Sequence, residues 1–508
     1  MAHKPQRDLQ KAHRRRKNRE SFLETLESIV VAFVLAFVFR AFVVEAFVIP
    51  TGSMGPTLYG QHAEFTCTDC GYTFAVGANG RLDSRPVVCP NCGQRQPVPP
   101  GVPIYSGDRI LVLKFLYDFT EPRRWEVIVF RNPNEPEENY IKRLVGLPGE
   151  TVELVRGNVT IKGRIAHKTD RAQEALWMLV HDTRHAPTRT GWHRRWIAEG
   201  LWDSDGAGFV LPRAPPAGRT AWLLYRHRNI MGQRDNIRDY YAYNSGVNGW
   251  GAGHNVCTDL RLTTEVAAET AEAVLVVEMR AWRDRFRFRL PAEGGEEPAQ
   301  ILLNGRVVAE AAGGVLPVGR RAEVEVANVD HALVLRVDGR RVTTTHSNPV
   351  TRQGDVTYQP TPVPEEMLQA CQAPPAPGRT PPMAHELRLG ARGGPLRLAY
   401  LRLDRDVYYV NSATPGHGTE GHPFTLKADE FFVLGDNSPK SYDSRAWCAA
   451  SNATGRPPNA GLPPFEGRPV IPRRNLVGKA FFVYWPAAGT RWHVPKVVPD
   501  PTGWRLVH

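Results

Sequence analysis

The chain has 508 residues and a formal net charge of +12, from 64 basic and 52 acidic side chains. Eight basic and two acidic residues fall within the first twenty positions, so half of the excess charge sits in an N-terminal tail and the rest of the chain is too weakly basic to predict a nucleic-acid partner. The 45 glycines and 43 prolines favour short strands over a helical bundle, and only seven cysteines exclude a disulfide scaffold.

An apolar segment follows the basic tail. Residues 28–39 carry no charge, and extending the run past Arg40 to Val44 reaches the lower limit of roughly 17 residues for a membrane-spanning helix. We therefore predict a basic cytoplasmic tail at residues 1–21 and one transmembrane signal anchor at residues 22–46. Because the basic flank precedes the anchor, the rest of the chain is expected outside the cytoplasm. A cleaved secretory signal is the alternative interpretation.

Four cysteines form two C-x-x-C pairs, Cys67 with Cys70 and Cys89 with Cys92, and residues 71–88 separate the pairs. This spacing can bring four thiolates to one tetrahedral ion, as in zinc ribbons. Residues 67–95 therefore predict a zinc-ribbon-like insert that holds a structural zinc. Two disulfides are the alternative, because thiols oxidise outside the cytoplasm.

The segments on either side of the cysteine pairs predict a discontinuous β domain. Short apolar runs bounded by Gly and Pro, such as residues 109–114 and 126–130, are typical of strands. The predicted domain comprises residues 47–66, 101–165 and 420–508.

A second β unit is predicted within that domain. The dipeptides Asn304-Gly305 and Asp338-Gly339 lie between apolar runs, as in two-residue hairpin turns. We predict a β-sandwich at residues 241–412, which resembles concanavalin-like (laminin-G-type) jelly rolls and carries no legible ligand site. Residues 166–240 have no interpretable pattern and are left as an unassigned insert.

Three motifs contain residue types that can take part in catalysis. Residues 50–58 read PTGSMGPTL, residues 140–150 read YIKRLVGLPGE, and residues 432–445 read FVLGDNSPKSYDSR. Taken singly, they also fit a turn after a helix, an edge-strand lysine facing water, and a polar turn with an architectural ion pair. A buried lysine, however, would lose its proton more readily, because desolvation penalises the ammonium.

Together and in this order, the motifs resemble those of bacterial type I signal peptidases, the membrane-bound Ser/Lys proteases that remove signal peptides. Residues 106–108 (SGD) and 475–482 (NLVGKAFF) extend the resemblance. It implies that Ser53 is the nucleophile and Lys142 the general base, with no cofactor for catalysis.

The resemblance also implies supporting roles for other residues. The Ser53 backbone N–H and the Thr51 hydroxyl would form the oxyanion hole, and Ser441 would orient the lysine. Asp443 and Arg445 would hold their loop in place.

The sequence thus predicts a mainly β signal peptidase I behind one N-terminal transmembrane helix, with ribbon and sandwich inserts. Its expected place is the bacterial cytoplasmic (inner) membrane, single-pass, with the N-terminus cytoplasmic. Its expected partners are signal-peptide-bearing preproteins and the lipid bilayer, and no nucleic acid is expected. Whether the sandwich binds an unknown ligand is left open. Because every predicted chemical group lies outside the sandwich, a variant lacking residues 240–412 is expected to keep cleaving.

Three alternatives stay open. A His-based triad is disfavoured because no G-x-S-x-G elbow frames Ser53 and no histidine lies in a matched motif. A catalytically inactive, membrane-tethered binding protein displaying a lectin-like sandwich would be marked by loss of Ser53 or Lys142, and both are present. A self-cleaving repressor would need a DNA-binding unit, which the sequence does not suggest.

Overall fold

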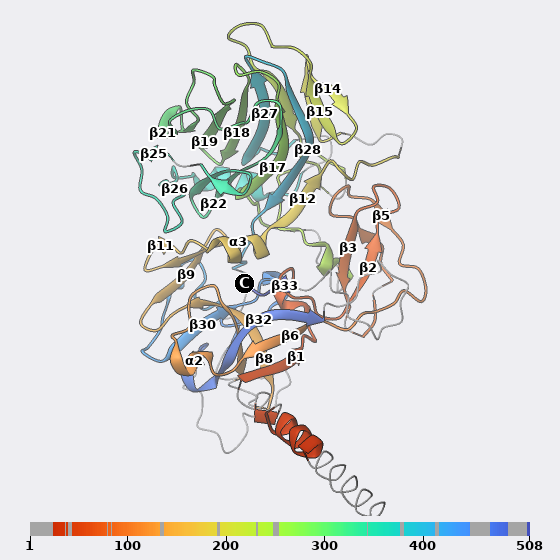
Figure 1. Ribbon diagram of the computed structural model, residues 1–508, viewed down its shortest axis with the longest axis vertical. Coiled ribbons are helices and arrows are strands. Elements are labelled where there is room, and N and C mark those ends of the chain that lie inside the picture. The colour runs from red at the N-terminus through yellow and green to blue at the C-terminus, as the bar shows by residue number, and fades with distance from the viewer. Residues whose placement is uncertain are drawn as a thin grey trace, which may run out of the picture.

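The structure is a computed structural model. It describes residues 24–35, 37–38, 43–78, 80–82, 84–132, 137–189, 194–229, 232–246, 253–342, 344–375, 380–411, 416–447, 468–485 and 505–508. It is mainly β, with several antiparallel sheets (Figure 1). The predicted cytoplasmic tail at residues 1–21 lies outside the described residues.

One eight-stranded antiparallel sheet collects strands from both ends of the chain. Its strand order is β1-β6-β32-β7-β8-β30-β31, and β33 pairs with β32. The bounds are β1 (Val44–Val48), β6 (Arg109–Leu113), β7 (Val127–Arg131), β8 (Asn139–Gly146), β30 (Glu430–Leu434), β31 (Ile471–Pro472), β32 (Leu476–Trp485) and β33 (Arg505–Leu506). The continuous apolar sequence of β7 is explained by its central place, since Val127 and Val129 pack into one core while Ile128 and Phe130 pack into another.

A four-stranded sheet, β11-β10-β9-β29, lies beside it. Its strands are β9 (Thr151–Val155), β10 (Asn158–Ile161), β11 (Arg164–Ile165) and β29 (Phe424–Thr425). The short helix α2 (Leu116–Phe119) precedes β7, and the one-turn helix η2 (Gly52–Met54) follows β1. Two further one-turn helices, η5 (Ser438–Lys440) and η6 (Arg473–Asn475), flank β31 in the sequence.

Two large antiparallel sheets form a sandwich around one hydrophobic core. The nine-stranded sheet contains β12 (Met178–Asp182), β14 (Asp203–Asp205), β15 (Gly208–Leu211), β17 (Leu260–Ala268), β22 (Arg321–Val329), β23 (Ala332–Val337), β24 (Arg340–Arg341), β26 (Val356–Thr357) and β28 (Leu396–Arg405). The eight-stranded sheet contains β13 (Trp196–Glu199), β16 (Ala221–Tyr225), β18 (Val274–Ala281), β19 (Asp284–Pro291), β20 (Gln300–Leu303), β21 (Arg306–Glu310), β25 (Thr345–His346) and β27 (His385–Arg392). Figure 1 shows this sandwich at the end of the molecule opposite β1 and β8.

The two predicted hairpin turns are confirmed. Asn304 and Gly305 have φ values of 50° and 84° between β20 and β21, and Asp338 and Gly339 have 49° and 71° between β23 and β24. Positive φ at both positions matches the twist of the flanking strands.

The sandwich begins earlier than the sequence predicted. Strands β12 to β16 lie within residues 166–240, which the sequence left unassigned. β12 and β15 pair with β28, β16 pairs with β27, and β13 and β14 pair with β16 and β15. They are three to five residues long, and β12, β15 and β16 have partners far along the chain, so local periodicity gives little signal for them. Helix α3 (Asp170–Leu176) precedes them, and α4 (Glu365–Gln372) lies between β26 and β27.

A buried ion-pair group joins the sandwich to the rest of the chain. Lys168 Nζ lies 2.8 Å from Asp330 Oδ1 and 2.7 Å from Asp406 Oδ2. Asp259 lies in the same acidic group. The chain's own ammonium therefore compensates carboxylates that burial would otherwise destabilise.

The cysteine-bearing segment forms two short hairpins. Strands β2 (His62–Thr66) and β3 (Thr73–Gly77) pair with each other, as do β4 (Val87–Val88) and β5 (Arg95–Gln96). The small core of these hairpins includes the four cysteines of the C-x-x-C motifs and also Ala242. Ala242 lies in η3 (Ala242–Gly246), which precedes β17.

The N-terminal apolar segment is described only in part. Residues 24–35 are helical, and their large apolar side chains, such as Phe33 and Leu35, are exposed. Within the part of the chain that the structure describes, no helix has the length and apolar character needed to cross a membrane. The predicted anchor extended to residue 46, but β1 begins at Val44 because residues 44–48 pair with β6.

Candidate active site

Ser53 lies in η2, the single helical turn between β1 and the ribbon. Thr51 is extended, and the Gly55 N–H donates to the Gly52 carbonyl oxygen at 3.2 Å, which closes the turn. Met54 is fully buried in the core under β6 and β7, so the turn is anchored beside the serine. Ser53 itself is 8% exposed, which places its hydroxyl in a largely dry environment.

Lys142 is brought to Ser53 by β8, a strand flanked by β7 and β30. Its Nζ atom donates to Ser53 Oγ at 2.8 Å and to the carbonyl oxygen of Ile141 at 3.1 Å. Lys142 is 5% exposed. Burial lowers the pKa of the Lys142 ammonium to about 8, against the opposing influence of the carboxylates of Asp443 and Asp436.

Each of these two carboxylates forms an ion pair with one arginine. Arg445 Nε and Nη2 lie 2.8 and 2.7 Å from the two oxygens of Asp443, and Arg143 Nε and Nη2 each lie 2.7 Å from an oxygen of Asp436. The guanidinium of Arg445 keeps the pKa of Asp443 low in spite of burial. Because both negative charges are neutralised by bidentate pairing, they favour the charged lysine less than free carboxylates would.

The loop after β30 is held by the Asp443–Arg445 pair. Arg445 Nη1 donates to the Val410 carbonyl oxygen at 2.7 Å, and Asp443 Oδ2 accepts the Gly435 N–H at 3.0 Å. These bonds tie the loop to β30 and to the segment that leaves the sandwich. The role of Asp443 and Arg445 in holding the loop stays a prediction.

Among the described hydrogen bonds, none joins Ser441 or Thr51 to the Ser53 or Lys142 side chain. The Ser441 hydroxyl packs against Gly435. Thr51 precedes Ser53 and is exposed. The roles of Ser441 and Thr51 stay predictions.

The sequence analysis assigned no role to four buried residues of the same motifs, Thr57, Arg143, Asp436 and Asn437. Arg143 and Asp436 have fully buried side chains, and Thr57 Oγ1 donates to Asp436 Oδ2 at 2.6 Å. Asn437 donates its backbone N–H to the Ser53 carbonyl oxygen at 3.0 Å. The signal was present, since Arg143 follows Lys142 directly and a G-D-N tripeptide lies after an apolar strand, but their partners lie in distant segments.

The four ribbon cysteines form one cluster, with their sulfur atoms within 4.8 Å of one another. Cys67 Sγ lies 3.6 Å from Cys92 Sγ, and Cys70 Sγ lies 3.7 Å from Cys89 Sγ. A tetrahedral zinc with Zn–S bonds of about 2.3 Å requires sulfur–sulfur distances of about 3.8 Å, so the donor set fits this ion. Gly71, which follows Cys70, has φ +70° and donates its N–H to the Cys67 carbonyl oxygen, forming the tight turn expected around a metal.

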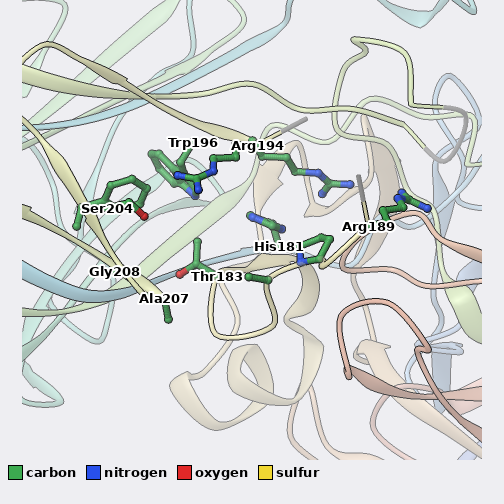
Figure 2. A pocket seen from close by; sticks show the side chains of 13 residues that line it. His181, Thr183, Arg189, Arg194, Trp196, Ser204, Ala207 and Gly208 are labelled. Atoms are coloured by element: carbon green, nitrogen blue, oxygen red, sulfur yellow. The ribbon is translucent and has the colours of Figure 1, made fainter. Parts of the chain in front are cut away.

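A cavity of about 300 Å³ lies elsewhere, in the sandwich. His181, Arg189, Arg194 and Trp196 line it (Figure 2). None of the predicted catalytic or metal residues contributes to its walls, so it is separate from the Ser53–Lys142 site.

A serine hydroxyl that is hydrogen-bonded to a buried lysine is the arrangement expected of a serine–lysine peptidase. The chain matches the family described as signal peptidase, peptidase S26, over residues 102–193 and 349–485. The match falls in two segments, so the part of the chain that resembles this family is split by an insert.

Individual relatives agree with the family match. Signal peptidase I of Rickettsia bellii (strain OSU 85-389) is 25% identical over 167 residues, which are 32% of this chain and 46% of the relative. Signal peptidase I of Pseudomonas aeruginosa is 36% identical over 140 residues, 27% of this chain and 37% of the relative. The chain thus spans less than half the length of these relatives.

Solved structures match this chain only at low TM-scores. The carbohydrate-binding module CBM66 from Bacillus subtilis has a TM-score of 0.24 at 9% identity, covering 41% of this chain and 95% of its own. The exoplasmic/lumenal domain of VIP36 has a TM-score of 0.26 at 9% identity, covering 46% of this chain and 92% of its own. These scores are too low to support a conclusion about fold or ligand.

Proposed function

We propose that this protein is a signal peptidase I, a membrane-anchored serine endopeptidase that cleaves N-terminal signal peptides from exported preproteins. The observation that carries the proposal is the 2.8 Å hydrogen bond between Lys142 Nζ and Ser53 Oγ. It joins a hydroxyl to an amine whose pKa, about 8, lets it act as a base near neutral pH.

In the acylation step, neutral Lys142 accepts the proton of Ser53 Oγ as this oxygen attacks the carbonyl carbon of the scissile peptide. The Ser53 N–H and the Thr51 hydroxyl stabilise the resulting oxyanion. The lysine ammonium then donates its proton to the leaving amine, and an ester links Ser53 to the signal peptide. In deacylation, Lys142 deprotonates a water molecule that attacks this ester, and the proton returns to Ser53.

The proposal includes the membrane topology. The basic tail at residues 1–21 would remain cytoplasmic and the apolar segment would anchor the chain in the bacterial cytoplasmic membrane. Signal peptides are presented at that membrane, so an anchored enzyme shares its location with the preprotein substrate. The concanavalin-like character of the sandwich and any ligand for it stay predictions.

The direct test is to incubate the full chain, purified in detergent, with a preprotein that carries a signal peptide. We expect one cleavage at the signal-peptide junction, and no cleavage by Ser53→Ala. Both proteins should show the same thermal unfolding. Equal cleavage by the wild type and Ser53→Ala would refute the assignment.

The pH dependence of kcat/KM reports the protonation state of the base in the free enzyme. Because the neutral amine is the active form and its pKa is about 8, kcat/KM should rise with pH and reach half of its plateau near pH 8. The measurement is a pH–rate profile between about pH 6 and 10. A rise centred near pH 6.5, the usual range of histidine, would point to a His-based mechanism instead.

The cysteine cluster would hold one structural zinc through Cys67, Cys70, Cys89 and Cys92. Bound zinc would cross-link the two hairpins of the ribbon and supply no catalytic chemistry. We expect about one zinc per chain by elemental analysis of protein purified without chelator, and a lower melting temperature after metal removal. Metal-free protein with all four cysteines blocked to alkylation until reduced would establish disulfides.

A further inference from the structure

Helix η3 belongs to the insert, yet it packs on the loop that carries the serine. A Cβ atom added to Gly52 would lie 2.1 Å from Tyr243 Cε1, so the tyrosine ring rests directly on the Gly52 backbone. The same ring would lie 2.5 Å from a Cβ atom at Gly77 of β3. Tyr243 is 4% exposed, and its hydroxyl donates to the Gln61 carbonyl oxygen at 3.1 Å. Its ring therefore fills the space between the ribbon and the serine loop.

Asn244, the next residue of η3, is hydrogen-bonded to the same loop through Asn437. The two side-chain amides exchange hydrogen bonds of 2.8 Å in both directions. The side-chain amide of Asn437 also donates to the Gly52 carbonyl oxygen at 2.9 Å. The backbone N–H of Asn437 donates to the Ser53 carbonyl oxygen at 3.0 Å. Asn244 is 5% exposed, so water cannot readily replace it as a partner.

We propose that Tyr243 and Asn244 are positioning residues for the hydrolytic reaction. Together they fix the peptide units of Gly52 and Ser53, which set both the direction of the serine hydroxyl and the backbone N–H of the oxyanion hole. The proposal rests on the proposed function. It means that the insert completes the active site, whereas the sequence predicted that the sandwich region is separable from catalysis.

The structure also explains why deleting residues 240–412 is unsuitable as a test. The deletion removes η3 together with β17 to β28, and it leaves β12, β15 and β16 without their partners β27 and β28. Point substitutions in the full-length chain avoid that problem.

The first experiment compares Asn244→Leu with Asn328→Leu. Both asparagines are buried and hydrogen-bonded, but Asn328 binds Thr258 and Tyr358 within the sandwich. Asn244→Leu should lower kcat about tenfold or more, because misplacement of a reacting group by ~1 Å can cost ~10²-fold. The midpoint of its pH–rate profile should not move, since Lys142 keeps its surroundings. Asn328→Leu should lower the melting temperature and leave kcat within about twofold.

The second experiment is a double-mutant cycle between the serine loop and the tyrosine ring. Gly52→Ala should lower kcat because the new methyl group meets the Tyr243 ring. Tyr243→Ala should lower kcat alone, yet raise it when added to Gly52→Ala, because it frees space for the methyl group. Tyr243→Phe keeps the ring and should retain most of the wild-type kcat.

The outcomes separate this proposal from the proposed function. If the wild type cleaves and Ser53→Ala does not, while Asn244→Leu behaves like Asn328→Leu and the cycle shows no coupling in kcat, the positioning role is refuted. If the wild type cleaves no preprotein, the proposed function is refuted, and the positioning role fails with it. Loss of activity in Asn244→Leu only in proportion to loss of folded protein would also refute the positioning role.

Discussion

Lys142→Arg is expected to lack preprotein processing at every pH at which the protein stays folded. A guanidinium group remains protonated far above the pH at which the Lys142 amine, with its pKa of about 8, becomes neutral. The loss of a general base typically costs about 10²–10⁴-fold in rate. The measurement is kcat/KM for a preprotein at several pH values up to about 10.

Lys142→Met is the matched control, because it removes the base with a chain of similar length and adds no charge to the site. It should be equally inactive and at least as stable as the wild type, since a buried ammonium is replaced by an apolar group. Activity in Lys142→Met that rises with pH as in the wild type would show that another group accepts the serine proton.

Arg143→Met is expected to destabilise the fold strongly. It would leave the Asp436 carboxylate, whose side chain is fully buried, without its guanidinium partner. Removing one member of a buried ion pair typically costs about 3–5 kcal/mol of the free energy of unfolding. The check is chemical denaturation of the purified variant against the wild type.

The double substitution Arg143→Met/Asp436→Leu separates the lost pair from the stranded charge. It should be more stable than Arg143→Met alone, because no buried charge remains. If enough Arg143→Met folds for kinetics, its pH–rate midpoint should lie above that of the wild type. The freed Asp436 carboxylate favours the Lys142 ammonium, as the direction of its influence on the Lys142 pKa requires. Equal stability of the single and double variants would contradict this account.

The parts of the site that sequence reasoning could find are those written into short contiguous motifs. Ser53 and Lys142 each lie in such a motif, and so do the cysteine pairs. Arg143 and Asp436 lie in the same motifs but 293 residues apart, and their pairing depends on β8 lying next to β30. Tyr243 and Asn244 had no signal, because nothing in residues 241–246 indicates that they pack on a loop so much earlier in the chain.

The same limit applies to the fold. The hairpins at Asn304-Gly305 and Asp338-Gly339 were predictable because each turn and both of its strands are adjacent in the sequence. Strands β15 and β16 were not, because they pair with β28 and β27, which come much later in the chain. Pairing with a distant strand stabilises such short sequences, which have little strand signal alone.

The position of β32 in its sheet has a consequence for the order of events after synthesis. β32 lies between β6 and β7, so it joins the half of the sheet that leads into Ser53 to the half that carries Lys142. Without residues 476–485, the β1–β6 pair next to Ser53 and the strands β7, β8 and β30 around Lys142 are two separate parts of the sheet, each with an open edge. The sheet that brings Ser53 next to Lys142 is therefore complete only after residues 476–485 have been synthesised.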